Sequence, residues 1–238
     1  MNSLLLICLL IFLSSSALAR DRVRLTARAN DLVPCEIPIV ADEAYRHMLQ
    51  VKLLVTPGDI ARSLFLPGIT GGETAISIYR APDKPGSMLG GYWLTVTQSP
   101  IPLWRCSPGY SKISPPIDPD TIAIERADAP LPEETALMLR TLWLAMLKRV
   151  KPEPATESIE VDTTKELFFV TQPDGKECCG SLPRRYGKNP KALFDLTNDL
   201  LNFACESVSN RPAILRRINR KAMALLSNIG GAGADRDT

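Results

Sequence analysis

Residues 74–98, TAISIYRAPDKPGSMLGGYWLTVTQ, decide the fold class of this 238-residue chain. Ile76 and Ile78 alternate with Ser77 and Tyr79 near the start of this stretch, and its last seven residues repeat the alternation. A period of two is the pattern of a strand with one buried face. Gly and Pro are frequent between the two parts, which indicates a turn. The stretch therefore predicts two antiparallel strands joined by a short connection.

Further strands are expected on either side of this pair. Apolar residues alternate with others in residues 49–55, which predicts a third strand of the same meander. Upstream, prolines among strand formers favour an extended conformation for residues 30–40, and residues 41–47 favour a short helical turn. Shorter strands are expected at residues 101–104, 121–125, 159–161 and 167–171.

Helical periodicity dominates the second half of the chain. Residues 132–150 place Pro132 in the first turn and basic residues in the last, as the helix dipole favours. A second helix is expected from Asn189, as its N-cap, with Pro190 at its first position. A third begins near residue 210 and is expected to stop at the two glycines 230 and 231.

The order of these elements indicates the architecture. Strands come first and helices later, without alternation between the two, which favours the α+β class. We expect an antiparallel sheet packed by two or three helices and stapled by disulfides. Residues 20–229 are expected to form a single domain, and residues 230–238 a flexible tail.

The start of the sequence predicts export. Residues 4–13 form an unbroken apolar run, a serine triplet follows, and Ala17-Leu18-Ala19 matches the small residues that signal peptidase accepts. The run is too short to cross a membrane as a helix. Residues 1–19 are therefore expected to be a signal peptide, leaving a soluble periplasmic or secreted protein without a transmembrane segment.

Export favours disulfides for the five cysteines that remain after cleavage. These disulfide candidates are Cys35, Cys106, Cys178, Cys179 and Cys205. Their pairing cannot be chosen from sequence, although Cys178 and Cys179 are neighbours and are not expected to bond each other. A metal site is not expected, because C-x-x-C does not occur and His47 is the one histidine.

The sequence does not contain the common catalytic and cofactor-binding motifs. G-x-S-x-G and S-x-x-K do not occur, and the glycine-rich stretches lack the order of a phosphate-binding loop, so no cofactor is expected. Neighbouring acids keep a carboxylate-dependent hydrolase open as an alternative. Basic residues near Cys178 likewise keep a thiol-dependent redox protein open. The acid pairs are Asp118 and Asp120, Glu133 and Glu134, and Glu160 and Asp162.

Charge gives a final set of candidates. A net charge of +2 argues against a dedicated nucleic-acid binder. Basic residues nevertheless gather on the polar side of the last helix, where they could contact an anionic surface or an envelope protein. They are Arg216, Arg217, Arg220 and Lys221. The sequence as a whole favours a non-catalytic binding or structural protein of the cell envelope or extracellular space, with an envelope enzyme as the alternative.

Overall fold

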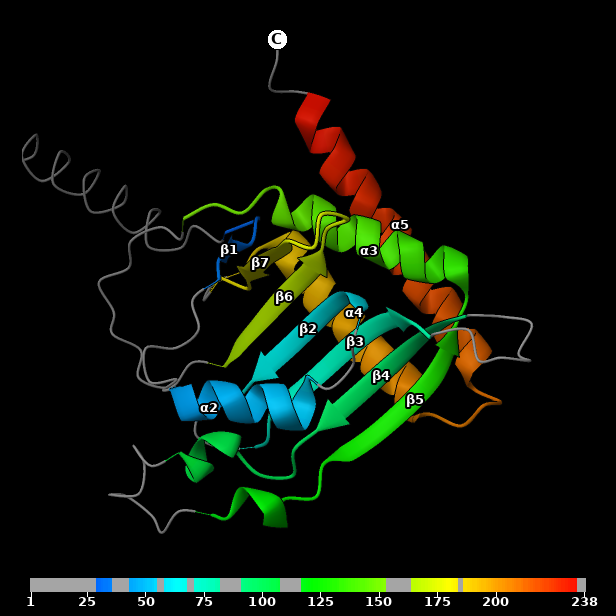
Figure 1. Ribbon diagram of the computed structural model, residues 1–238. Coiled ribbons are helices and arrows are strands. Elements are labelled where there is room, and N and C mark those ends of the chain that lie inside the picture. The colour runs from blue at the N-terminus through cyan, green and yellow to red at the C-terminus, as the bar shows by residue number, and fades with distance from the viewer. Residues whose placement is uncertain are drawn as a thin grey trace, which may run out of the picture.

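Seven strands in the described part of the chain form one antiparallel sheet, in the order β1-β7-β6-β2-β3-β4-β5 (Figure 1). The computed structural model describes residues 29–35, 43–54, 58–67, 71–81, 91–107, 117–152, 164–183 and 186–234. The strands are β1 (Val33–Pro34), β2 (Asp59–Leu66), β3 (Thr74–Arg80), β4 (Tyr92–Gln98), β5 (Glu125–Leu131), β6 (Lys165–Thr171) and β7 (Glu177–Ser181). The expected α+β class with an antiparallel sheet is confirmed.

The strand pair predicted by residues 74–98 is present. Thr74 of β3 lies opposite Gln98 of β4 at one end of the pair, and Arg80 lies opposite Tyr92 at the other. Because side chains of a strand alternate between its faces, Ile76 and Ile78 both point to the helix-covered core. The alternation in the sequence therefore reports which face of these strands is buried.

The expected strand 49–55, in contrast, is not present in its described part, residues 49–54. α2 (Glu43–Met48) continues as a short π-helix, Leu49–Leu53, and this helical segment packs on the sheet. Tyr45, Leu49 and Leu53 are buried, whereas Val51 is 50% exposed. A spacing of four residues lines one side of a helix and also falls on one face of a strand. The period-two prediction is wrong here because a short apolar run fits both periods.

The third strand of the meander is β2 instead, which pairs with β3 and β6. Nothing in the sequence predicted it, because Arg62 and Ser63 interrupt its apolar pattern. Both are largely buried in the fold: the Arg62 side chain is 15% exposed and Ser63 is 1% exposed. β2 thus lies in the middle of the sheet and carries polar groups to both faces.

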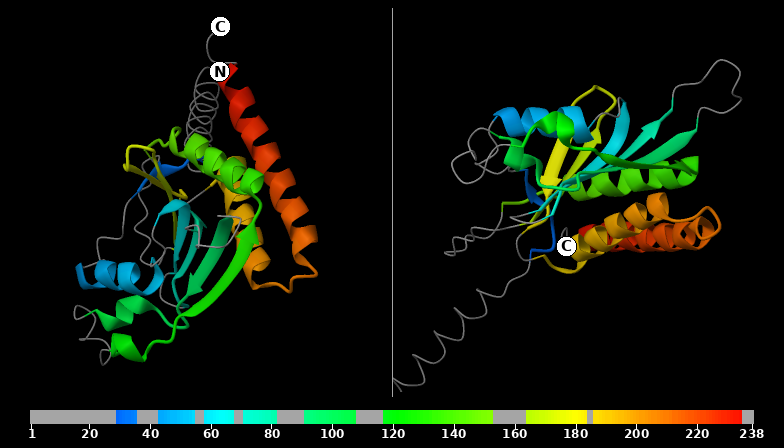
Figure 2. Two further views of the ribbon diagram at one scale, coloured as in Figure 1. Left: turned by 45° about the vertical axis from the view of Figure 1, so that its right-hand side comes forward. Right: turned by 90° about the horizontal axis from the view of Figure 1, so that it is seen from below.

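Three helices of the described residues cover one face of the sheet, here called the inner face. They are α3 (Glu133–Leu147), α4 (Lys188–Cys205) and α5 (Arg211–Ala234), and α2 lies on the opposite, outer face (Figure 2). α3 packs on β2, β6 and β7, α4 packs on β3, β4 and β5, and α5 packs against both helices. The inner core is built mainly of apolar side chains, and within it Trp143 meets Phe168 edge to face.

Two helix ends differ from expectation. α4 begins at Lys188, and Gly187 takes the N-cap position predicted for Asn189. The side chain of Asn30 caps this helix instead, since its Oδ1 accepts a hydrogen bond of 3.1 Å from the Asn189 N–H. α5 does not stop at Gly230 but continues to Ala234. Gly230 and the glycine after it do not adopt the positive φ that would end a helix.

Two of the short expected strands are replaced by 3-10 helices. Leu103–Cys106 is one of them, where residues 101–104 were expected to be extended. Pro119–Thr121 is the other, and it precedes β5, which begins at Glu125 rather than residue 121. Pro130 lies within β5, which pairs only with β4 among the described strands. Proline is tolerated at such an edge because one side of the strand makes no ladder bonds.

The segment before α2 ties distant elements together. β1 pairs with β7, and the Lys151 N–H after α3 donates to the Leu32 carbonyl at 2.9 Å. Asp31 forms ion pairs with Arg149 at 2.9 Å and with Lys151 at 2.7 Å. Burial alone would raise the pKa of Asp31, but its hydrogen bonds and charge interactions with these two cations hold it below its ordinary value.

Some expectations fall on residues that are not described. The signal peptide 1–19, the strand 159–161 and the last part of the tail 230–238 lie outside the described residues. No helix within the described ranges combines the length and the apolar character that crossing a membrane requires.

Candidate functional site

One disulfide joins two of the five candidate cysteines. Cys35, directly after β1, is bonded to Cys179 of β7, and the two Cα atoms are 5.5 Å apart. This separation lies within the usual range for a disulfide. Cys178 points to the opposite face of β7 from Cys179, as consecutive strand residues do. The expectation that the adjacent cysteines do not bond each other is therefore confirmed, and the bridge fastens the two-residue strand β1 to the sheet.

The other described cysteines are free thiols on three different elements. Cys178 accepts a hydrogen bond of 2.6 Å from Gln172 Nε2, and Cys205 is exposed at the end of α4. Burial, reinforced by the Glu73 carboxylate, raises the pKa of Cys106. A raised pKa keeps that sulfur as an unreactive thiol at neutral pH. The fold does not gather these three thiols into one site.

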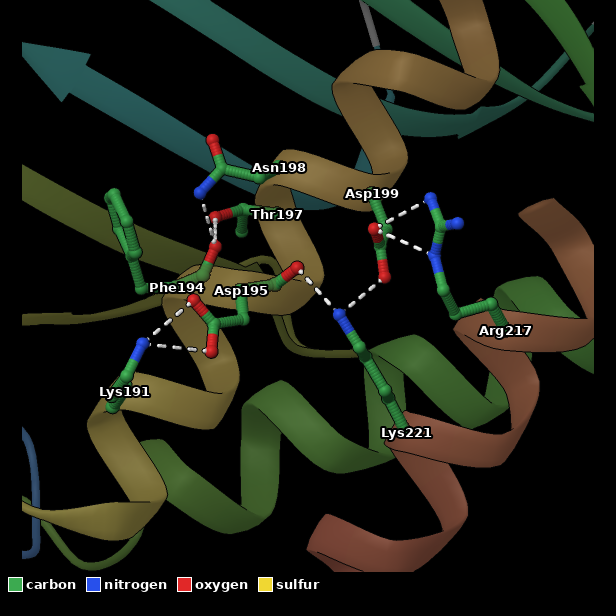
Figure 3. A network of polar contacts seen from close by, with 8 residues as sticks. All are labelled: Lys191, Phe194, Asp195, Thr197, Asn198, Asp199, Arg217 and Lys221. Atoms are coloured by element: carbon green, nitrogen blue, oxygen red, sulfur yellow. Dashed lines mark hydrogen bonds and ion pairs between the residues drawn. The ribbon is translucent and has the colours of Figure 1, made fainter.

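The basic residues predicted to line one surface of α5 are divided by the fold. Arg217 Nε and Nη2 lie 3.0 and 2.9 Å from Asp199 Oδ1 of α4, and Lys221 Nζ lies 2.7 Å from Oδ2 (Figure 3). The same lysine donates to the Asp195 carbonyl at 3.3 Å. The Asp199 side chain is only 9% exposed, so these contacts belong to the α4–α5 interface. Two of the four predicted surface cations therefore hold the helices together.

The other two basic residues remain available. Arg216 and Arg220 are exposed, one turn apart on α5, and no ion pair or hydrogen bond joins them to another described residue. Met223 follows on the same side of the helix and is 63% exposed. This side is the part of the predicted anionic-surface contact that the fold leaves open.

The outer face of the sheet carries a row of ring side chains beyond the region that α2 covers. Tyr79 of β3 lies directly opposite Trp93 of β4, and Trp93 lies opposite Pro130 of β5. Tyr79 and Trp93 are half-buried and Pro130 is exposed. Their strand neighbours point into the inner core, so all three rings point outward. Strand pairing thus aligns three rings from segments far apart in sequence.

A polar row lies beside the rings, two residues further along each strand. It consists of Ser77, Thr95 and Asp128, which are directly opposite one another on β3, β4 and β5. Ser77 and Thr95 are almost completely buried, while Asp128 is exposed on the edge strand. Arg126 lies on the same face as Asp128, because the two are separated by two positions. We call Tyr79, Trp93, Arg126, Asp128 and Pro130 the outer platform.

The arginine of the outer platform is held in a fixed orientation. Arg126 Nε lies 3.0 Å from Asp128 Oδ2, and Nη2 lies 3.1 Å from Oδ1. Thr95 Oγ1 also donates to Asp128 Oδ1. The hydrogen bond to Asp128 raises the pKa of Arg126, and Tyr79 adds to this. Burial alone would raise the pKa of Asp128, but Arg126 and Thr95 hold it below its ordinary value, so both charges persist at neutral pH.

A second arginine crosses the same face nearer the disulfide. Arg62 Nη1 lies 3.0 Å from Asp59 Oδ2, and Nη2 lies 2.6 Å from Glu177 Oε1. Its guanidinium also stacks over Phe169, 4.7 Å from the ring centroid. Arg62 therefore connects β2 to β7 across β6. Because its guanidinium already binds two carboxylates, Arg62 stabilises the sheet rather than offering a free group to a ligand.

Two carboxyl groups are buried, on opposite sides of the sheet. Glu73 receives a hydrogen bond of 2.8 Å from Tyr45 Oη and one of 2.7 Å from the Leu103 N–H, on the outer side. Glu166 lies on the inner side, where Ser63 Oγ is 3.3 Å from its Oε1. Burial raises the pKa of both, that of Glu166 to about 7, although hydrogen bonds partly oppose the change. The sheet separates them, so they cannot act as a pair.

The acid pairs noticed in the sequence have ordinary positions where they are described. The Asp118 side chain accepts from the Asp120 N–H at 3.0 Å, and Asp120 lies 3.7 Å from Lys52. Glu133 and its neighbour are exposed in the first turn of α3. The pair at 160 and 162 lies outside the described residues, and His47 is exposed on α2. Within the described ranges, no group of three or more His, Cys, Asp or Glu side chains could hold a metal ion.

Sequence reasoning did not find the outer platform. Tyr79 and Trp93 were recognised only as strand residues, and Arg126 and Asp128 were not recognised as belonging to a strand. Their juxtaposition depends on the pairing of β3, β4 and β5, which places positions 79, 93 and 130 in one row. The one local signal was Arg-x-Asp beside an alternating segment, which is too common to interpret alone. No protein-family model, curated protein or solved structure matches the chain.

Proposed function

We propose that this chain is an exported, non-catalytic binding protein that holds its ligand on the outer platform. The observation that carries the proposal is the row Tyr79, Trp93 and Pro130 beside the oriented guanidinium of Arg126. Trp, Tyr and Arg are the side chains most enriched among the energetic centres of interfaces. Here they occur together on the part of the outer face that lies beyond α2.

The rigidity of the platform supports binding. Its residues belong to paired strands rather than loops, and Arg126 is fixed by Asp128 before any ligand arrives. Ordering a long side chain on binding costs about 0.5–1.5 kcal/mol, and a preorganised side chain avoids most of this cost. Thr95 is buried beneath the carboxylate and restrains it further.

Export is supported by two independent features. The disulfide between Cys35 and Cys179 is typical of proteins in oxidising compartments. The signal-peptide pattern of residues 1–19 predicts the same destination. We therefore propose a periplasmic or extracellular location. N-terminal sequencing of the exported protein should begin at Arg20, and a protein that begins at Met1 contradicts cleavage.

The alternative, an envelope enzyme, has less support from the described residues. The two carboxyls with raised pKa values lie on opposite sides of the sheet, and Asp128 is committed to Arg126. Cys178, the thiol of the redox alternative, packs against the inner core, whereas Cys106 packs on the outer face and Cys205 is exposed at the end of α4, so the described free thiols are not gathered for redox exchange. Binding without chemistry fits the arrangement better.

Arrays of defined oligosaccharides and defined peptides test the proposal. The full exported protein should bind probes of at least one array. Trp93→Ala and Arg126→Ala should each weaken this binding about tenfold or more, as expected for central interface residues. Met223→Ala and Arg216→Ala are matched controls, because they remove exposed groups from α5 behind the sheet. Binding that survives the platform variants, or no binding on either array, contradicts the proposal.

A further inference from the structure

We infer that the ligand of the outer platform is a carbohydrate, an inference that rests on the proposed function. The first reason is the ring row itself. Adjacent strands are about 4.8 Å apart, so the row from Tyr79 across Trp93 to Pro130 spans about 10 Å. That length exceeds a single sugar ring and suits an oligosaccharide. The aromatic face carries negative charge density, which attracts the weakly positive C–H groups on the flat side of a sugar.

The second reason is the polar chemistry beside the rings. A sugar hydroxyl both donates and accepts, so it is satisfied best by a donor and an acceptor side by side. Arg126 has five N–H donors; those on Nε and Nη2 engage Asp128, and Nη2 also lies 3.5 Å from Thr95 Oγ1. At least one donor is left over. Among the described residues, Asp128 Oδ2 accepts from Arg126 Nε alone, so it keeps lone pairs for a ligand donor.

The charge balance also favours a hydroxyl-rich ligand. Arg126 and Asp128 neutralise each other, with side chains 44% and 37% exposed. A strongly anionic ligand would meet the Asp128 carboxylate, and a cationic ligand would meet the guanidinium. A neutral ring with adjacent hydroxyls can bind both groups without an unpaired charge.

A proline-rich peptide is the principal competitor, since such peptides dock on aromatic surfaces. Proline residues have no N–H, and a polyproline helix offers carbonyl acceptors but few donors. Asp128 would then lie next to the ligand with no new donor for its Oδ2. Asp128 would keep its bonds from Arg126 and Thr95 but would lose its water contacts without gaining a donor in exchange, so the carboxylate disfavours this occupant.

The decisive experiment compares two probe sets with the full exported protein. Neutral tetrasaccharides, with plain or N-acetylated sugars, should bind more tightly than their monosaccharides, and a proline-rich decapeptide should not bind. Asp128→Asn removes the charge but keeps the shape, and Arg126→Lys keeps the charge but removes the planar fork. Each should weaken tetrasaccharide binding about tenfold or more, while Arg220→Ala leaves it unchanged.

The outcomes separate the two proposals. Peptide binding that depends on Trp93, without sugar binding, overturns the carbohydrate inference and leaves the binding function intact. Binding of either probe set that is indifferent to every platform variant overturns both. Circular dichroism and thermal unfolding of each variant show whether a loss of binding reflects a loss of fold.

Discussion

Cys35 is bonded to Cys179 although the two residues are 144 positions apart in sequence. The bond fastens the outermost strand, β1, to β7, which holds only two residue pairs with it. Two residue pairs provide few backbone hydrogen bonds to hold such a short strand in place. The disulfide therefore secures the segment whose Asn30 and Asp31 contact the start of α4 and the end of α3.

Removing this bond should destabilise the fold strongly. Closing a loop of this length restricts the unfolded chain by about 5 kcal/mol on the chain-entropy model, although measured losses are about 2–5 kcal/mol. The double variant Cys35→Ser with Cys179→Ser should lose about 3 kcal/mol or more of unfolding free energy in urea. Cys205→Ser, an exposed free thiol, is the control and should change little. If the double variant and Cys205→Ser lose the same small amount of unfolding free energy, the disulfide does not stabilise β1.

The pairing of Asp199 with Arg217 predicts unequal roles for neighbouring arginines. Arg217→Ala should lower the unfolding free energy by about 1 kcal/mol, because Asp199 is mostly buried while the arginine is half-exposed. Arg216→Ala, next to it in sequence but turned to solvent, should stay within about 0.5 kcal/mol of the parent. Chemical denaturation measures both. If the two variants lose the same stability, the ion pair does not hold α4 to α5.

Glu166 makes stability depend on pH. Its pKa is raised from 4.5 to about 7 in the fold, so the folded protein binds more protons than the unfolded chain between these values. The contribution of Glu166 to the unfolding free energy is therefore fully present below about pH 4.5 and is lost as the pH rises through about 7. The loss approaches about 3 kcal/mol at high pH, because each tenfold change in proton affinity corresponds to about 1.4 kcal/mol.

Glu166→Gln tests this dependence, because glutamine has the same shape and no charge. The variant should match the parent near pH 5 and exceed it by about 3 kcal/mol or less near pH 9. Urea unfolding at the two pH values measures the difference. Parallel pH profiles for variant and parent would show that Glu166 does not titrate in this range.

Two glycines should respond in opposite ways to a methyl group. A Cβ on Gly72 would lie 1.7 Å from the Ser99 carbonyl oxygen, in the backbone that leaves β4. Gly72→Ala should therefore lower the unfolding free energy by about 3 kcal/mol or more, because the clashing atoms belong to the backbone and cannot move aside easily. Gly230 lies in α5 with nothing within 4 Å of such a Cβ, and Gly230→Ala should stabilise by up to about 1 kcal/mol. Similar thermal shifts for both variants would contradict the close approach at Gly72.

Local sequence patterns predicted the helices and strands whose buried side chains recur at regular spacing. β3, β4 and α3 are present where alternation or helical spacing placed them, because one face of each packs on the core. β2 escaped notice because Arg62 and Ser63 are held by partners on β7 and β6, 115 and 103 positions away. No local pattern contains those partners.

The candidate site was harder to predict, for the same reason. Helical periodicity correctly placed Arg217 on the polar side of α5, but only the packing of α4 supplies Asp199. The outer platform likewise arises from the register of three strands, two of them joined by a long connection that ends in a 3-10 helix. The sequence shows which residue types are present. Only the strand pairing and the helix packing show which of these residues come into contact.

The most direct test of the central claim, that the outer platform is the ligand site, uses the indole N–H signals of the three tryptophans. Trp93 is half-buried on the platform, whereas Trp143 is 0% exposed in the inner core. The tetrasaccharide that binds most tightly should shift the NMR signal of Trp93, assigned with Trp93→Phe, and leave that of Trp143 in place. A ligand that shifts Trp143 or Trp104 while Trp93 stays unchanged would contradict the account, as would a Trp93 signal that no bound probe moves.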